Sequence, residues 1–243
     1  MMKIGRQTRL VRIVPLAILI AIGGWGDPAL AQKTEKVNPA FAAPVVDESL
    51  PNVLLIGDSI SIGYMLATRE ELKGEANVYR PATNCGPTTQ GLSHLDQWLG
   101  DTQWDVIHFN FGLHDLKYMN AKGDLAEPNA DGVRQQVPLD EYAENLRQIA
   151  TRLKQTGAVV IWRETTPVPE GSAGRIAGDA VRYNEVARKV IESVGGIQVD
   201  PMHAFATQNA ALQIPANVHY TNQGSKVLAK HVAAIIRNSL AKP

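Results

Sequence analysis

The stretch Val53-Leu54-Leu55-Ile56-Gly57-Asp58-Ser59 decides the fold class of this chain. Four consecutive apolar residues ended by a glycine are typical of a parallel strand that is buried on both faces. Similar runs recur along the chain, so we expect further strands at residues 76–79, 104–111, 158–162 and 197–199.

Segments with helical periodicity lie between these runs. Apolar residues recur at i, i+3, i+4 and i+7 in residues 139–153, 183–194 and 227–240, which predicts three amphipathic helices. Strands that alternate with helices indicate right-handed βαβ units. We therefore predict an α/β fold, a three-layer α/β/α sandwich around a five-stranded parallel sheet. Ligands of such sheets bind beyond the carboxyl ends of the strands. The polar stretch 120–137 is expected to be a long irregular loop.

Composition excludes several classes of protein. The 243 residues carry 24 Lys and Arg against 24 Asp and Glu, a balance that argues against a dedicated nucleic-acid binder. The single cysteine, Cys85, cannot form an internal disulfide, and no Cys/His spacing indicates a zinc site. An enzyme or a carbohydrate-binding module remains, with no metal and no cofactor expected.

Residues 1–31 have the features of an export signal. A basic start precedes the apolar run 13–22, and Ala29-Leu30-Ala31 forms a small-x-small cleavage site. A membrane anchor is the alternative, but a span needs about 20 apolar residues. We expect cleavage after Ala31, a periplasmic or secreted protein without a stable membrane anchor, a flexible leader at 32–50 and one domain at 51–243.

Ser59 is the candidate nucleophile. It follows the first strand, so it is expected at the carboxyl edge of the sheet, on the first turn into a helix. There nearby N–H groups and the helix dipole can support a negative charge. The alternative is that Ser59 only caps a helix beginning at Ile60, since serine is a preferred N-cap. The G-x-S-x-G motif of α/β-hydrolases is absent, because Ser61 stands where its second glycine would be.

A nucleophilic serine needs a base, and His219 is the best placed of six histidines. It lies in the loop 217–221 before the last helix, which should return to the same edge of the sheet. Two further segments follow strands, namely Gly86 after the second and Gly112-Leu113-His114-Asp115 after the third. The Gly86 N–H is a candidate donor of an oxyanion hole. We expect His94, His108 and His231 to be structural or solvated. The role of His203 is left open.

In order and spacing these segments resemble the conserved blocks of the SGNH (GDSL-type) hydrolases. Gly57-Asp58-Ser59 matches the first block, which carries the nucleophile, and Gly86 matches the second-block glycine. Residues 112–115 look like the third block, G-x-N-D, and 218–224 look like the last block around the catalytic histidine. The resemblance covers residues 51–240 and implies a flavodoxin-like SGNH fold with serine esterase activity.

Two departures from the family pattern matter. His114 replaces the third-block asparagine, whose side chain is an oxyanion donor, and Ala216 stands where the family has an aspartate three residues before the histidine. Neutral histidine still has one ring donor. We expect a Ser59–His219 dyad oriented by a main-chain carbonyl or by Asn217. Three carboxylates are alternatives for this role: Asp115, Glu164 and Asp200.

The resemblance implies an acyl-enzyme mechanism on ester substrates. The oxyanion would be held by the N–H groups of Ser59 and Gly86 and by the His114 side chain. We favour O-acetyl groups on carbohydrate as substrate. The alternatives are a general short-chain esterase or lysophospholipase-like enzyme, or a non-catalytic glycan-binding member of the fold. Five residues are weaker substrate-binding candidates: Asp58, Asp115, Tyr118, Arg163 and Glu164.

Overall fold

The structure, a computed structural model, describes residues 38–241. The export signal expected at residues 1–31 and the first part of the leader lie outside these residues. Within 38–241, no helix is both long enough and apolar enough to cross a bilayer.

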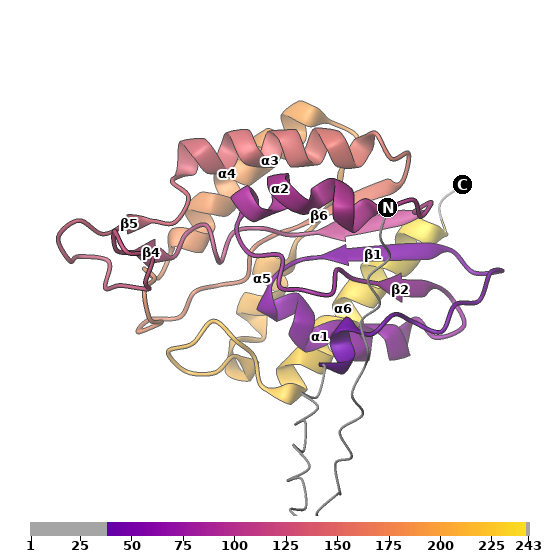
Figure 1. Cartoon of the computed structure of the whole chain (residues 1–243). Helices are drawn as coiled ribbons and strands as arrows, with labels where there is room; N and C mark the ends of the chain where they lie inside the picture. The colour runs from indigo at the N-terminus through magenta and orange to yellow at the C-terminus, as the bar shows by residue number, and fades with distance from the viewer. Residues whose placement is uncertain (1–37, 242–243) are drawn as a thin grey trace, which may run out of the picture. The chain divides into compact units, whose positions relative to one another are not determined.

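The centre of the fold is a five-stranded parallel sheet in the order β2-β1-β3-β6-β7 (Figure 1). The predicted five-strand sheet and the three-layer α/β/α fold are therefore confirmed. The strands have these bounds: β1 Asn52–Ile56, β2 Asn77–Tyr79, β3 Val106–Phe109, β6 Val159–Arg163 and β7 Gln198–Asp200. All five lie within two residues of the predicted runs, and β3 is two residues shorter at each end than the expected 104–111.

Helices cover both faces of the sheet (Figure 1). On one face α1 (Ser59–Glu71) packs along α6 (Asn222–Leu240). On the other, α3 (Leu139–Lys154) lies between α2 (Thr88–Leu99) and α4 (Asp179–Val194). The short α5 (Met202–Gln208) follows β7, and two 3-10 turns complete the described helices: η1 Pro39–Phe41 and η2 Ala210–Leu212. All three helices predicted from periodicity are present.

The strand order places a topological switch between β1 and β3. From β1 the chain crosses to β2 on one side and then returns to place β3 on the other. Ile56 is level with Phe109 in the sheet, so the segments after β1 and β3 emerge side by side. Ligands of open parallel sheets bind at such a point. Ser59 lies just after the end of β1, and Gly112 lies just after the end of β3, so both are at this point.

The expected flexible leader needs correction for residues 38–50. Asn38 caps η1 by accepting the Ala40 N–H at 3.0 Å, and Ala40 is only 2% exposed. The Asn77 side chain at the start of β2 then holds the segment, because it accepts the Asp47 N–H at 2.9 Å and donates to the Asp47 carbonyl at 2.8 Å. The packed unit thus begins before residue 51.

The stretch 120–137 is less irregular than expected. Tyr118–Met119 (β4) and Arg134–Gln135 (β5) form a small antiparallel pair on either side of a polar loop. These strands have two residues each, too few to show an alternating pattern in the sequence.

Candidate active site

Ser59 is the first residue of α1, and its Oγ lies 2.9 Å from Nε2 of His219. The helix cap is the preceding residue: the Asp58 carboxylate accepts the Ile60 N–H at 3.0 Å and is 2% exposed. The alternative that Ser59 only caps the helix is therefore wrong. Asp58 is correspondingly a buried cap and not a substrate contact. Ser59 is left at the positive end of the α1 dipole with its hydroxyl facing the histidine.

Asn217 contacts the other side of the His219 ring. Its Oδ1 lies 2.7 Å from Nδ1 of His219 and also accepts the backbone N–H of His219 at 3.0 Å. A backbone N–H can only donate, so the amide oxygen must face this residue. Nδ1 therefore carries the ring proton, and Nε2 is left as the acceptor for the Ser59 hydroxyl. This is the tautomer that a general base requires.

The loop that carries His219 is closed by main-chain hydrogen bonds. Ile214 donates its N–H to the His219 carbonyl at 2.9 Å, and Asn217 donates to the Ile214 carbonyl at 3.2 Å. Ala216 turns the chain with a positive φ of 52°. This turn brings Asn217, rather than the position three residues before the histidine, to the imidazole.

The loop after β2 supplies Gly86. Its φ is +62°, and a side chain there would collide with the Gln90 amide at 2.2 Å from the added Cβ. The Gly86 N–H donates to the Asn84 side chain at 3.0 Å. To donate a hydrogen bond to an oxyanion, this N–H must therefore either share its hydrogen between both acceptors or break its bond to Asn84.

His114 lies half-buried in the segment after β3. Burial lowers the pKa of His114; the Asp58 carboxylate opposes this shift, while the charges of Lys117, Arg175 and His219 add to it. The ring is therefore neutral at neutral pH and keeps one N–H donor. In this state the ring can still donate one hydrogen bond to an oxyanion.

Arg80, which we did not single out from the sequence, ties the two sides of the site together. It is 8% exposed. Its guanidinium donates to four groups on both segments: the Ser61 Oγ at 3.0 Å, the Gly57 carbonyl at 3.2 Å, the Thr83 carbonyl at 3.0 Å and the Pro81 carbonyl at 3.2 Å. A planar guanidinium suits such divergent acceptors. Arg80 thus fixes the turn that carries Ser59 against the loop that carries Gly86.

Comparison with known proteins identifies the family of this chain. The family model of the GDSL-like lipase/acylhydrolase family matches residues 55–227. The chain belongs to this family. A GDSL esterase/lipase of Arabidopsis thaliana is 26% identical over 133 residues, which is 49% of this chain and 43% of that protein, so the chain spans less than half of this curated relative.

Solved structures show the same fold at low identity. A lipase/acylhydrolase from Enterococcus faecalis has a TM-score of 0.62 at 16% identity and covers 77% of this chain and 96% of that one. An acetylxylan esterase from Geobacillus stearothermophilus has a TM-score of 0.61 at 15% identity and covers 79% and 95%.

The three carboxylates considered for orienting His219 all lie elsewhere in this GDSL-like fold. Asp115 is fully buried, and its Oδ1 accepts the N–H of Thr88 at 2.8 Å and the Thr88 hydroxyl at 2.6 Å. Burial outweighs these hydrogen bonds and raises the pKa of Asp115 to about 7. Asp115 therefore anchors the start of α2 and does not contact substrate, contrary to expectation.

Asp200, at the end of β7, bridges two other histidines. Its Oδ2 lies 2.9 Å from Nε2 of His108, and its Oδ1 lies 2.6 Å from Nε2 of His231. Burial opposes ionisation of this carboxyl, but hydrogen bonds and charges from both histidines hold its pKa well below the usual range. His108 is fully buried, which lowers its pKa. This group is a second histidine network, separate from Ser59.

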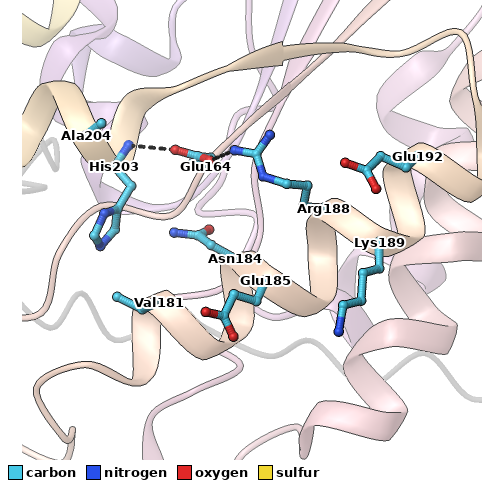
Figure 2. Close-up of a pocket in the computed structure, with 9 residues that line it drawn as sticks. All are labelled: Glu164, Val181, Asn184, Glu185, Arg188, Lys189, Glu192, His203 and Ala204. Atoms are coloured by element: carbon cyan, nitrogen blue, oxygen red, sulfur yellow. Dashed lines mark hydrogen bonds and ion pairs between the residues drawn. The ribbon is translucent and has the colours of Figure 1, made fainter.

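Glu164 and Arg163 also differ from the expected substrate-gripping loop residues. Figure 2 shows Glu164 between Arg188 of α4, with which it forms an ion pair, and the backbone N–H of His203 at 3.3 Å. Arg163 is the last residue of β6, is fully buried, and donates to the Asn110 amide oxygen at 2.6 Å. Neither side chain lies on a surface loop beside Ser59.

Two other residues have structural roles. Tyr118, in β4, donates its hydroxyl to Oδ2 of Asp179 at 3.3 Å, which ties the β4–β5 pair to the start of α4. Cys85 is fully buried beside Gly86, and burial raises the pKa of its thiol to about 11. It stays protonated at neutral pH and is no nucleophile.

Proposed function

We propose that this protein is an exported serine esterase that removes short acyl groups, in particular O-acetyl groups from carbohydrate. The observation that carries the proposal is the line of contacts Asn217–His219–Ser59, with 2.7 Å at Nδ1 and 2.9 Å at Nε2. It has the geometry of a nucleophile, a base and a group that orients the base.

The reaction follows from these contacts. Nε2 of His219 takes the hydroxyl proton of Ser59 as Oγ attacks the ester carbonyl carbon. The carbonyl oxygen becomes an oxyanion next to the N–H groups of Ser59 and Gly86 and the ring N–H of His114. His219 then gives its proton to the leaving alkoxide as the carbon–oxygen bond breaks. Water attacks the acyl-enzyme in the same way, which releases the acid and restores Ser59.

The amide of Asn217 makes this base weaker than one with a carboxylate. An amide oxygen orients the ring as an aspartate would, but it adds no negative charge to stabilise the imidazolium that forms. The positive end of the α1 dipole compensates in part, because it acts on the developing oxyanion.

Two observations support acetylated carbohydrate as substrate. Ser59 is half-buried while His219 is exposed, so a bulky chain can approach the ester without entering a tunnel. Two of the proteins with a similar fold are acetylxylan esterases. The export signal expected at residues 1–31 would bring the enzyme to such polymers outside the cytoplasm. N-terminal sequencing of the protein from the cell envelope or medium tests this part, with Gln32 expected first.

Hydrolysis of p-nitrophenyl acetate by the purified protein, beside Ser59→Ala, tests the esterase proposal. We expect the wild type to be active and the variant to fall to the background rate, whereas equal rates would overturn the proposal. Acetate release from acetylated xylan, compared with fatty-acid release from a lysophospholipid, then separates the carbohydrate esterase from the lysophospholipase-like alternative. Binding of xylan without any turnover would favour the non-catalytic alternative.

A further inference from the structure

A cavity of about 480 Å³ lies between one side of α2 and the loop after β2, the loop that carries Gly86. We call it the α2 cavity. Its wall includes Thr83 from the loop and Gln90, His94, Gln97 and Trp98 from the helix. Because Gln90 and Trp98 are eight residues apart, the helical wall is about 12 Å long at 1.5 Å per residue. This is longer than one sugar ring.

Two rings of this wall form an aromatic platform. His94 and Trp98 are one turn apart on α2 and stack at 5.9 Å with an interplanar angle of 17°. Nδ1 of His94 lies 2.8 Å from the Ser93 hydroxyl and 3.1 Å from the Gln90 carbonyl, so Nε2 is the ring nitrogen that faces a ligand. His94 is exposed and Trp98 is half-buried. The stacked pair offers apolar ring surface and a hydrogen-bonding ring nitrogen, which suit a sugar ring with its apolar C–H faces and rim of hydroxyls.

The polar groups of the wall are uncharged. Gln90 and Gln97 carry amides, which both donate and accept, and Thr83 adds a hydroxyl. The contrast is the cavity between α4 and α5, which is lined by Glu164, Arg188 and four other ionisable side chains (Figure 2). There Glu164 is already engaged by Arg188 and by the His203 N–H. A neutral, hydroxyl-rich ligand fits the α2 cavity better.

Gln90 links the wall of the α2 cavity to the loop that carries Gly86. The Gln90 amide donates to the Asn84 carbonyl at 3.0 Å, and the Asn84 side chain accepts the Gly86 N–H at 3.0 Å. One wall residue of the cavity therefore also supports the loop with the expected oxyanion donor.

We propose that the α2 cavity is a subsite for a neutral polysaccharide chain, which binds the sugar units adjacent to the acetylated one, with His94 and Trp98 as the stacking platform. This inference rests on the proposed function and deepens it. It predicts that the enzyme prefers long acetylated oligosaccharides over a single acetylated sugar, and that the preference depends on α2.

The test compares acetylated xylohexaose, acetylated xylose and p-nitrophenyl acetate as substrates. We expect His94→Ala and Trp98→Ala to raise KM for the hexaose about fivefold to tenfold, which corresponds to a loss of about 1.0–1.4 kcal/mol of binding free energy for the stacked contact. Rates with acetylated xylose and p-nitrophenyl acetate should not change. Leu92→Ala is the matched control, because Leu92 is 37% exposed on the same helix outside the cavity wall.

Direct binding separates the subsite from the reaction. Unacetylated xylohexaose is titrated into Ser59→Ala by calorimetry, with and without His94→Ala, which replaces an exposed residue and should not impair folding. Binding that His94→Ala weakens supports the subsite even if no esterase activity is found. No binding, or a chain-length preference unchanged in both α2 variants, overturns the subsite while Ser59-dependent hydrolysis leaves the esterase proposal intact.

Discussion

Two histidine networks in this protein differ in partner and in exposure. His219 lies in an exposed loop and pairs with a neutral amide on one side and a serine hydroxyl on the other. His108 and His231 share the carboxylate of Asp200, which is fully buried. A search for a histidine next to an aspartate would select the second network, where no hydroxyl nucleophile contacts either ring among the described hydrogen bonds. Access to a serine at a helix N-terminus, rather than pairing with a carboxylate, distinguishes the network that can do chemistry.

The largest effect should come from removing the exposed histidine. His219→Ala is expected to lower kcat for p-nitrophenyl acetate by about 10³-fold or more, because the base and the proton donor are lost together. Its Tm should equal that of the wild type, since the ring is exposed. His231→Ala is the paired variant, expected to lower Tm and to keep the kcat of the folded enzyme. The reverse pattern would exchange the roles of the two networks.

The next effect concerns stability. Asp200→Asn should lower the free energy of unfolding by about 3 kcal/mol, because the buried carboxylate charge that both His108 and His231 contact is removed. Asp96→Asn is the control: its carboxylate pairs with Arg152 at 2.8 Å but is 80% exposed, and surface pairs contribute little. Urea unfolding monitored by circular dichroism measures both. Equal, small losses would show that Asp200 does not hold the fold together.

A smaller effect is expected at the amide that orients His219. Asn217→Ala should lower kcat about 10-fold to 100-fold with little change in KM, because the ring loses its fixed orientation but not its nucleophile partner. Asn217→Asp should raise kcat and move the acid limb of the pH–rate profile to higher pH, since a carboxylate stabilises the imidazolium. Asn222→Ala, a nearby exposed amide, should change neither. Full activity in Asn217→Ala would mean that another group orients the base.

The last effect concerns a buried carboxyl without a histidine partner. The pKa of Asp115 is raised to about 7 in the folded protein by burial, against about 4 in an unfolded chain. The folded state therefore binds the extra proton, and the stability from this group is full below pH 4 and lost as pH rises through 7. Asp115→Asn should flatten that part of the curve of unfolding free energy against pH. Asp200, whose pKa is lowered, acts in the opposite sense and loses its contribution in acid. An unchanged curve in Asp115→Asn would contradict this assignment.

Much of the active-site arrangement could be predicted from the sequence, because the ends of buried strands can be recognised there. Buried strands are continuous apolar runs, and in a parallel sheet their carboxyl ends meet at one edge. Ser59, Gly86 and His114 each follow a strand, and His219 precedes the last helix. The switch between β1 and β3 then brings segments distant in sequence together.

The errors arose where burial depends on tertiary contacts. Arg163 lies one residue beyond the apolar run 158–162, where a charged residue indicates a loop, yet β6 continues through it into the interior. Residues 38–50 lack periodicity, and their packing depends on distant side chains, namely Asn77, Arg69 and Arg80. Arg80 follows a three-residue strand in no motif, so its four acceptors could not be foreseen. One local signal was available: Asn38-Pro39 is a typical helix start.

Covalent trapping tests the central claim most directly, that Ser59 is a nucleophile activated by His219. The wild type and His219→Ala are treated with diisopropyl fluorophosphate, which phosphorylates an activated serine with loss of fluoride, and the adduct is located by peptide mass spectrometry. We predict one adduct, on Ser59, in the wild type and none in His219→Ala. An adduct on another residue, or equal labelling of Ser59 in both proteins, would contradict the account.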